Sequence, residues 1–300
     1  MNATDVSPMW DTVAYNAGFI ALRPTPLAIK LYLIIRKMTQ EYKSMDDQGS
    51  LNRAIKRLRN QNPAFTMRVL NRQSFLSGHA YFEQGGRMLP RPNTCDPSRR
   101  PNCPIVVHNN WIVSKSAKIY RFREHLMWLY DGDNRYYSSD TRNYITYRNS
   151  NGSAQLAALS TALAMGHLLD RVVILPTFIC GGGNRTRRCP LNSLIRISRL
   201  DSSFKDRFRE SSFLRHPKVP DVVKRSLYDG GAVLRRGGTT TSDVRITSRQ
   251  LTKLFAKVSA RVLNVGNLSG VQIIFDDKSE GEMFKQKLQQ GIRRAGYRQY

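Results

Sequence analysis

The sequence has no apolar run long enough to cross a bilayer, and Met1–Asp5 does not have the composition of a signal peptide. We therefore expect a membrane anchor only if one is encoded upstream of Met1. Acidic residues are also scarce, because 22 Asp and Glu stand against 48 Lys and Arg, and the formal net charge is +26. This charge attracts polyanions whatever the fold, so it is compatible with an acidic ligand or simply with a basic solvated surface.

The basic residues do not form one block, and the chain lacks RNP, zinc-finger and KH signatures. A nucleic-acid-binding protein is one hypothesis for the charge, but we expect no specific nucleic-acid partner.

Cysteine is scarce as well. The four cysteines form two close pairs, Cys95 with Cys103 and Cys180 with Cys189, each across turn-rich sequence. Neither pair has Cys-x-x-Cys spacing and no His lies nearby, which favours two local disulfides over a zinc site. Disulfides and N-glycosylation sequons fit a lumenal or extracellular glycoprotein. The sequons begin at Asn2, Asn151, Asn184 and Asn267.

A series of short polar and aromatic strings follows in order along the first part of the chain. They are Tyr15-Asn16-Ala17-Gly18-Phe19, Arg23-Pro24-Thr25, Asp46-Asp47-Gln48 with Leu51-Asn52, Gly78 with Tyr81-Phe82-Glu83, His108-Asn109-Asn110-Trp111 and Lys118–Leu126. This segment, from Tyr15 to about Tyr137, resembles the C-terminal half of the nucleotide-diphospho-sugar transferase domain of the glycosyltransferase family 77 type. No strand ending in Asp-x-Asp precedes Tyr15, so the first half of that domain is not expected in this chain, which reads as a fragment or a divergent member.

The expected fold class is α/β. Residues 1–137 should form a partial nucleotide-sugar transferase (GT-A-like) mixed sheet, and residues 142–300 a second α/β domain of uncertain role. In the second domain, the order strand, helix, strand is typical of a parallel sheet and occupies Tyr144–Tyr147, Gln155–Leu169 and Val172–Pro176. Within it, the string from Asn151-Gly152-Ser153 to Pro176 has a weaker resemblance to fucosyltransferase-like proteins.

Hydrophobic periodicity predicts the remaining elements. Strands are expected at 14–22, 68–70, 105–108 and 271–275, helices at 26–41, from about 47, 116–130, 248–259 and 280–293, a loop at 230–242 and a turn at Asp131-Gly132-Asp133.

His108 follows an apolar strand, so it should lie at the carboxyl edge of a sheet, where α/β folds bind ligands. The resemblance implies that His108 is a ligand of Mn²⁺, which accepts imidazole together with carboxylate and phosphate oxygens. Lys115 then meets the diphosphate as a point charge. The alternative is an ordinary strand-end histidine bound to a neighbour.

Asp46, Asp47 and Gln48 resemble the acidic group that contacts the donor sugar or the incoming hydroxyl, and we assign them the catalytic role. Carboxylates suit this task because they accept hydrogen bonds from several hydroxyls. The alternative is that the acids cap the following helix. The resemblance also assigns substrate binding to a set of neighbouring residues. These are Asn16, Gly18, Asn109, Asn110 and Trp111.

The resemblance implies a hexosyl- or pentosyltransferase that moves a sugar from a nucleotide diphosphate donor to a glycan or glycoprotein. The donor is expected to be a UDP sugar, and the transfer to retain the anomeric configuration. The resemblance also implies Mn²⁺ dependence and residence in the Golgi lumen. The alternative is a non-catalytic, lectin-like or scaffold relic of such an enzyme, because this chain lacks the Asp-x-Asp half.

Overall fold

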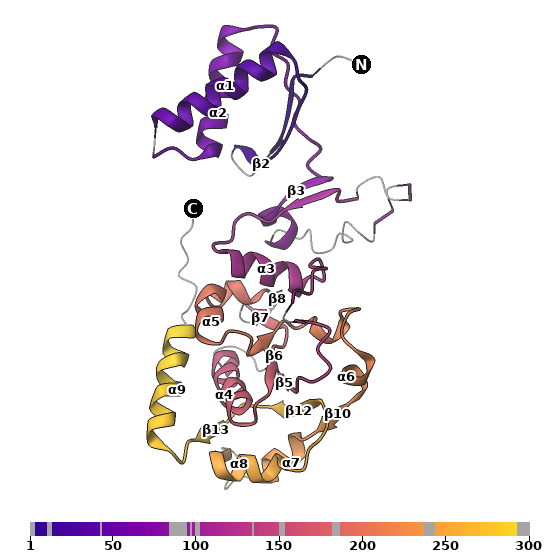
Figure 1. The fold of residues 1–300 in the computed structure, drawn as a ribbon, viewed down its shortest axis with the longest axis vertical. Helices are drawn as coiled ribbons and strands as arrows, with labels where there is room; N and C mark the ends of the chain where they lie inside the picture. Colours follow the sequence, from indigo (N-terminus) through magenta and orange to yellow (C-terminus); the bar gives the residue numbers. More distant parts are fainter. Residues whose placement is uncertain are drawn as a thin grey trace. The chain divides into compact units, whose positions relative to one another are not determined.

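The computed structural model describes most of the chain. The described residues are 4–10, 14–42, 44–83, 95–96, 98–99, 103–133, 135–149, 154–181, 187–236 and 244–292. The chain divides into two compact units, Met1–Ile112 and Val113–Tyr300 (Figure 1). Within the described ranges, no helix has both the length and the apolarity to span a membrane.

The first unit is built on two small strand pairs and two helices (Figure 1). Strand β1 (Val6–Trp10) pairs antiparallel with β2 (Tyr15–Leu22), and β3 (Phe75–Ser77) pairs parallel with β4 (Val106–His108). Its other elements are α1 (Pro26–Glu41), α2 (Asp47–Gln61) and the π-helical turn η1 (His79–Glu83). Helices α1 and α2 pack against each other, and α2 also contacts β2.

The start of α1 is fixed by both local and tertiary contacts. Pro26 occupies the first turn, and the Thr25 hydroxyl accepts a hydrogen bond from the Ala28 amide as the N-cap. Thr25 also donates to the carboxylate of Asp5 at 2.5 Å, and Asp5 accepts from the Thr66 amide at 2.8 Å. Burial opposes ionisation of Asp5, but these bonds outweigh it and lower its pKa. The same carboxylate therefore joins the hairpin, α1 and the segment after α2.

The core of the first unit is small and apolar. It consists of Val6, Ala28, Leu31, Leu51, Ala54, Ile55, Leu58 and Phe65. The members from α2 recur at helical spacing, so one face of that helix is buried, as its sequence predicts.

The second unit contains a five-stranded parallel sheet of order β10-β12-β5-β6-β9. These strands are Leu227–Asp229, Val262–Asn267, Tyr144–Arg148, Val172–Ile174 and Phe208–Arg209. A separate parallel pair joins β11 (Val244–Thr247) to β13 (Val271–Ile274). The helices are α3 (Lys115–Glu124), α4 (Ala154–Leu168), α5 (Ile197–Ser203), α6 (Asp221–Arg225), α7 (Gly231–Arg236), α8 (Ser248–Phe255) and α9 (Lys278–Gly291), with short turns η4 (Leu191–Ser193) and η5 (Phe213–Arg215).

Both faces of this sheet are covered. One face carries Tyr144, Val172 and Val262 into an aromatic core with Tyr137 and Phe213. Side chains alternate along a strand, so Ile145 and Val173 face the opposite side, where α4 packs on β5 and β6. A Cβ atom at Gly166 of α4 would lie 2.7 Å from Val173 Cγ2, which shows how closely the helix approaches the sheet.

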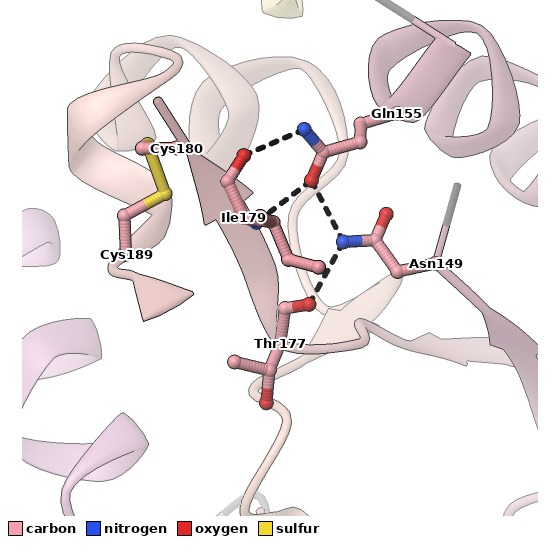
Figure 2. The surroundings of a disulfide bond; sticks show 6 residues. All are labelled: Asn149, Gln155, Thr177, Ile179, Cys180 and Cys189. Atoms are coloured by element: carbon pink, nitrogen blue, oxygen red, sulfur yellow. Dashed lines mark hydrogen bonds between the residues drawn. A yellow bond between two sulfur atoms is a disulfide. The ribbon is translucent and has the colours of Figure 1, made fainter. Parts of the chain in front are cut away.

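The hairpin formed by β7 (Phe178–Cys180) and β8 (Arg187–Cys189) carries a disulfide between Cys180 and Cys189 (Figure 2). The buried Gln155 side chain donates from Nε2 to the Ile179 carbonyl at 2.8 Å, and its Oε1 accepts from the Ile179 amide at 2.8 Å and from Asn149 Nδ2 at 2.7 Å. Gln155 thus ties α4 to the hairpin and to the end of β5. Cys95 and Cys103 are also bonded, so both predicted disulfides are confirmed.

The predicted order of strand, helix and strand at 144–176 is confirmed, and so is the turn at Asp131-Gly132-Asp133. The turn is held by the Asp131 carboxylate, which accepts from the Tyr137 amide and the Ser138 hydroxyl. Most other elements occur where predicted, although α7 occupies the first part of the predicted loop at 230–242.

Two predicted elements are wrong in part. Residues 68–70 form no strand, although the Arg68 and Leu70 amides donate to carbonyls of β1, and β3 lies a few residues later. The helix predicted over 116–130 ends at Glu124, because Leu126 adopts a left-handed φ of 56° that an α-helix does not allow.

The domain boundary predicted between residues 137 and 142 stays a prediction, because compact units need not coincide with domains. Helix α3 falls in the second unit and packs against α5. The compact units therefore divide the chain earlier, after Ile112.

Candidate functional site

A bulge in β2 brings the first predicted site residues into position. The register of the hairpin shifts between Pro8, which faces Ile20, and Met9, which faces Asn16, so Ala17, Gly18 and Phe19 have no partner in β1. Within the bulge, the Gly18 amide donates to Asn16 Oδ1 at 2.7 Å. Asn16 is buried, so its side chain fixes the backbone locally.

The imidazole of His108 lies directly against this bulge. A Cβ atom at residue 18 would overlap Cε1 and Nε2 of the His108 ring and would lie 2.9 Å from Asn16 Oδ1. Only glycine leaves room for the ring at this point. The rings of Phe19 and Phe75, 5.4 Å apart, hold β2 against β3, the strand that pairs with β4. The structure therefore brings together Asn16, Gly18 and His108.

The residues after His108 form a tight turn. The Asn110 amide donates to the His108 carbonyl at 2.8 Å, and Asn110 Oδ1 accepts from the Gly78 amide at 2.6 Å. Trp111 has a φ of 57° and is 38% exposed, with its ring 5.3 Å from that of His79. Asn109 is buried. The side chain of Asn110 therefore serves to join the ends of β3 and β4.

Asp46 is the N-cap of α2. Its Oδ1 accepts from the Gly49 amide at 2.7 Å, and Asp47 Oδ1 accepts from the Gln48 amide at 2.8 Å. Both acids are exposed, and Gln48 is half-buried. The capping role considered as the alternative for Asp46 is present, and contact with a sugar stays a prediction for all three residues.

Asn52 links the start of α2 to the strand that carries the bulge. Its Nδ2 donates to the carbonyls of Gln48 and Tyr15, both at 2.8 Å, and its Oδ1 accepts from the Tyr15 amide at 3.0 Å. Tyr15 precedes Asn16, so the first turn of α2 is connected through one side chain to the residues beside His108. No role was predicted for Asn52, although its spacing of one helical turn from Gln48 was a signal for this contact.

Lys115 is exposed and opens α3 in the second unit, whereas His108 belongs to the first unit, so contact of Lys115 with a diphosphate stays a prediction. Among the described residues, no three His, Cys, Asp or Glu side chains come together as a metal shell. The three atoms nearest to a Cβ atom at residue 18 belong to the His108 imidazole and the Asn16 amide. The described residues thus supply one candidate ligand for Mn²⁺, His108, and not a complete site.

Comparison with known proteins gives this cluster a context. The family model described as nucleotide-diphospho-sugar transferase matches residues 2–122. Residues 2–122, here called the transferase segment, are similar to nucleotide-diphospho-sugar transferases. The transferase segment contains all the predicted site residues, and the resemblance stated from the sequence is confirmed. The expected α/β class, with parallel strand pairing in both units, is also confirmed.

The chain is also similar to the curated protein "Arabinosyltransferase XEG113" of Arabidopsis thaliana. The two are 22% identical over an alignment that covers 96% of this chain and 53% of that protein. The chain therefore spans about half the length of this relative, and the similarity extends beyond the transferase segment. No solved structure matches the chain. The resemblance of the second unit to fucosyltransferase-like proteins stays a prediction.

Proposed function

We propose that this chain acts in glycosyl transfer, moving a sugar from a nucleotide diphosphate donor to a glycan or glycoprotein acceptor. The observation that carries the proposal is the packing of the His108 imidazole on Gly18 beside the Asn16 amide, inside the segment that matches a nucleotide-diphospho-sugar transferase.

The residues have distinct tasks in this proposal. Gly18 leaves room for the His108 ring beside β2, and the Asn16 amide recognises a sugar hydroxyl. Asp46, Asp47 and Gln48 bind further hydroxyls at the exposed N-terminus of α2. Asn52 keeps that helix end in register with β2 through its bonds to Gln48 and Tyr15. Asn109, Asn110 and Trp111 are the other residues that we assign to binding of the nucleotide-sugar donor.

Negative charge develops on the diphosphate as the glycosidic bond breaks, and a cation near the departing oxygen lowers that barrier. A bound Mn²⁺ would supply such charge stabilisation, and His108 is the residue of this chain that we propose as its ligand. Mn²⁺ binding can be followed without activity, by the loss of the free-ion electron paramagnetic resonance signal on titration. We expect His108→Ala to weaken binding and His167→Ala, at an exposed position, to leave it unchanged.

The donor we propose to test first is a UDP-linked arabinose, because the Arabidopsis relative carries that sugar in its name. UDP itself, retention of configuration and location in the Golgi lumen rest on the family resemblance. Two disulfides support an oxidising compartment.

The decisive experiment incubates the full chain with radiolabelled UDP-arabinose or UDP-hexoses, Mn²⁺ and glycan acceptors, and measures both transfer and hydrolysis. We expect turnover that His108→Ala removes and His167→Ala preserves. Donor binding without turnover would instead support the lectin-like or scaffold alternative. A chain that binds no nucleotide sugar at all would contradict both functions.

A further inference from the structure

The second unit contains a cavity of about 130 Å³ that is lined by none of the predicted transferase site residues. It lies between α3, α5 and β9, and the two helices lie side by side in Figure 1. Its polar lining consists of Ser116, Arg123, Tyr136, Asp201, Asp206 and Arg209. The floor is buried, whereas Arg123, Asp201 and Asp206 are half-buried at the rim. Pockets for whole drug-sized ligands are larger, about 300 Å³ or more, so this one suits a single small group.

Arg209 is the unusual residue in this cavity, because its side chain is fully buried. Its Nη1 donates to the carbonyls of Phe208 at 2.8 Å and Asp206 at 3.3 Å, which fixes the plane of the guanidinium. Among the described residues, its Nε and Nη2 have no hydrogen-bond partner. In proteins, this edge of a guanidinium can donate two parallel hydrogen bonds to two oxygens of one carboxylate or phosphate.

A second guanidinium reinforces the site. Both guanidiniums lie over the Tyr136 ring, with Cζ of Arg123 3.4 Å and Cζ of Arg209 4.0 Å from the ring centroid. The Tyr136 hydroxyl donates to the buried Glu210 carboxylate at 2.7 Å, which anchors the ring. In the described part of the chain, Arg123 Nε also lacks a partner. Two cations are therefore held at fixed places around one aromatic ring.

Two carboxylates, Asp201 and Asp206, line the same cavity and partly oppose this positive charge. Burial, and then the neighbouring charge of Asp206, raise the pKa of Asp201. Carboxyl groups placed beside guanidinium donors suit a ligand that carries hydroxyls as well as an oxyanion, since the acids accept hydrogen bonds from the hydroxyls.

We propose that this cavity binds the oxyanion group, carboxylate or phosphate, of a small hydroxylated ligand such as a sugar acid or sugar phosphate, with two of its oxygens on Nε and Nη2 of Arg209. Left empty of a ligand or ordered water, this buried edge would be costly. None of the cavity-lining residues is a predicted transferase site residue, so binding here can be measured without glycosyl transfer.

The test titrates the full chain at physiological salt with inorganic phosphate, glucuronate and glucose, by calorimetry and, for phosphate, by ³¹P line broadening. We expect saturable binding of phosphate, glucuronate or both, and none of glucose; the anion that binds identifies which group the site takes. Arg209→Lys keeps the charge but loses the two-nitrogen edge, so we expect ~10-fold weaker binding or more. The matched control Arg225→Lys, in an exposed ion pair with Asp221, should bind as the wild type does.

Asp201→Asn provides an independent readout if Arg209→Lys does not fold, as judged by near-ultraviolet circular dichroism. Removing this carboxylate should tighten binding of whichever anion the wild type takes several-fold, because less negative charge opposes that anion. Absence of saturable binding of both anions overturns the proposal. Affinity for the bound anion that is unchanged in Asp201→Asn, or unchanged in a folded Arg209→Lys, overturns it as well.

Discussion

The His108 ring occupies the space that a side chain at Gly18 would need. This relationship joins two residues that are far apart in the sequence, one in the bulge of β2 and the other at the end of β4. It means that the predicted donor-binding strand and the predicted metal ligand are parts of one packed cluster.

Gly18→Ala should therefore displace the His108 ring. We expect a loss of about 1–3 kcal/mol in the free energy of unfolding, because overpacking forces the ring or β2 to move. Nucleotide-sugar binding should weaken in parallel. Urea unfolding and a donor-binding titration measure the two effects. Gly231→Ala is the matched control, since its nearest neighbours would lie 3.4 Å from the new atom. A Gly18→Ala variant with wild-type stability and binding would show that the contact is unimportant.

The two roles of Asp46 can be separated by substitution. Asp46→Ala should cost about 1 kcal/mol of stability because the cap to Gly49 is lost, whereas Asp46→Asn retains a capping oxygen. If the carboxylate also binds the sugar, Asp46→Asn should reduce turnover at least tenfold with almost no change in the urea midpoint. Asp277→Asn, at the N-cap of α9, controls for capping alone. Full activity of Asp46→Asn would leave Asp46 as a cap only.

The buried His216 should make stability depend on pH. The centroid of its ring lies 3.6 Å from that of the Tyr137 ring, on which it stacks. Nδ1 accepts a hydrogen bond from the Lys218 amide and Nε2 donates one to the Trp128 carbonyl, which requires the neutral form of the imidazole. Burial lowers the pKa of His216 below its ordinary value of 6.5. The unfolded chain therefore takes up a proton first as the pH falls.

This stability contribution is complete above pH 6.5 and declines as the pH falls from there toward the folded pKa. Urea unfolding at pH 7.5 and 5.5 should show a smaller free energy at the lower pH. In His216→Gln, the free energy should be lower at both values but should change less between them. An equal pH effect in the two proteins would assign it to other groups.

Gln155 should contribute more to stability than an exposed glutamine does. Gln155→Met leaves the amide and the carbonyl of Ile179 without their partner, and we expect a loss of about 3 kcal/mol in the free energy of unfolding. Gln155→Glu keeps the acceptor for the Ile179 amide but sets a second acceptor against the Ile179 carbonyl and buries a charge, so it should lose stability as well. Gln289→Met, at an exposed position of α9, is the control for helix propensity. Equal urea midpoints for the two Met variants would contradict the role of Gln155.

The fold class and most elements could be predicted from the sequence because their signals are local. Helical spacing of Leu51, Ala54 and Ile55 marks the buried face of α2, and the close cysteine pairs mark both disulfides. The end of α3 could not be predicted, because the left-handed turn at Leu126 has no glycine or proline to signal it. Segment 68–70 has the composition of a strand but finds only an irregular pairing beside β1.

The sequence by itself determined which residues are candidates: the strings around Asn16, Asp46 and His108 are short, contiguous and characteristic of a family. Only the tertiary structure decided that the His108 ring packs on Gly18, that Asn52 connects α2 to β2 and that Arg209 lines a cavity with α3 and α5. Each of these contacts joins separate elements, and its geometry depends on how those elements pack, which no local pattern of residues encodes.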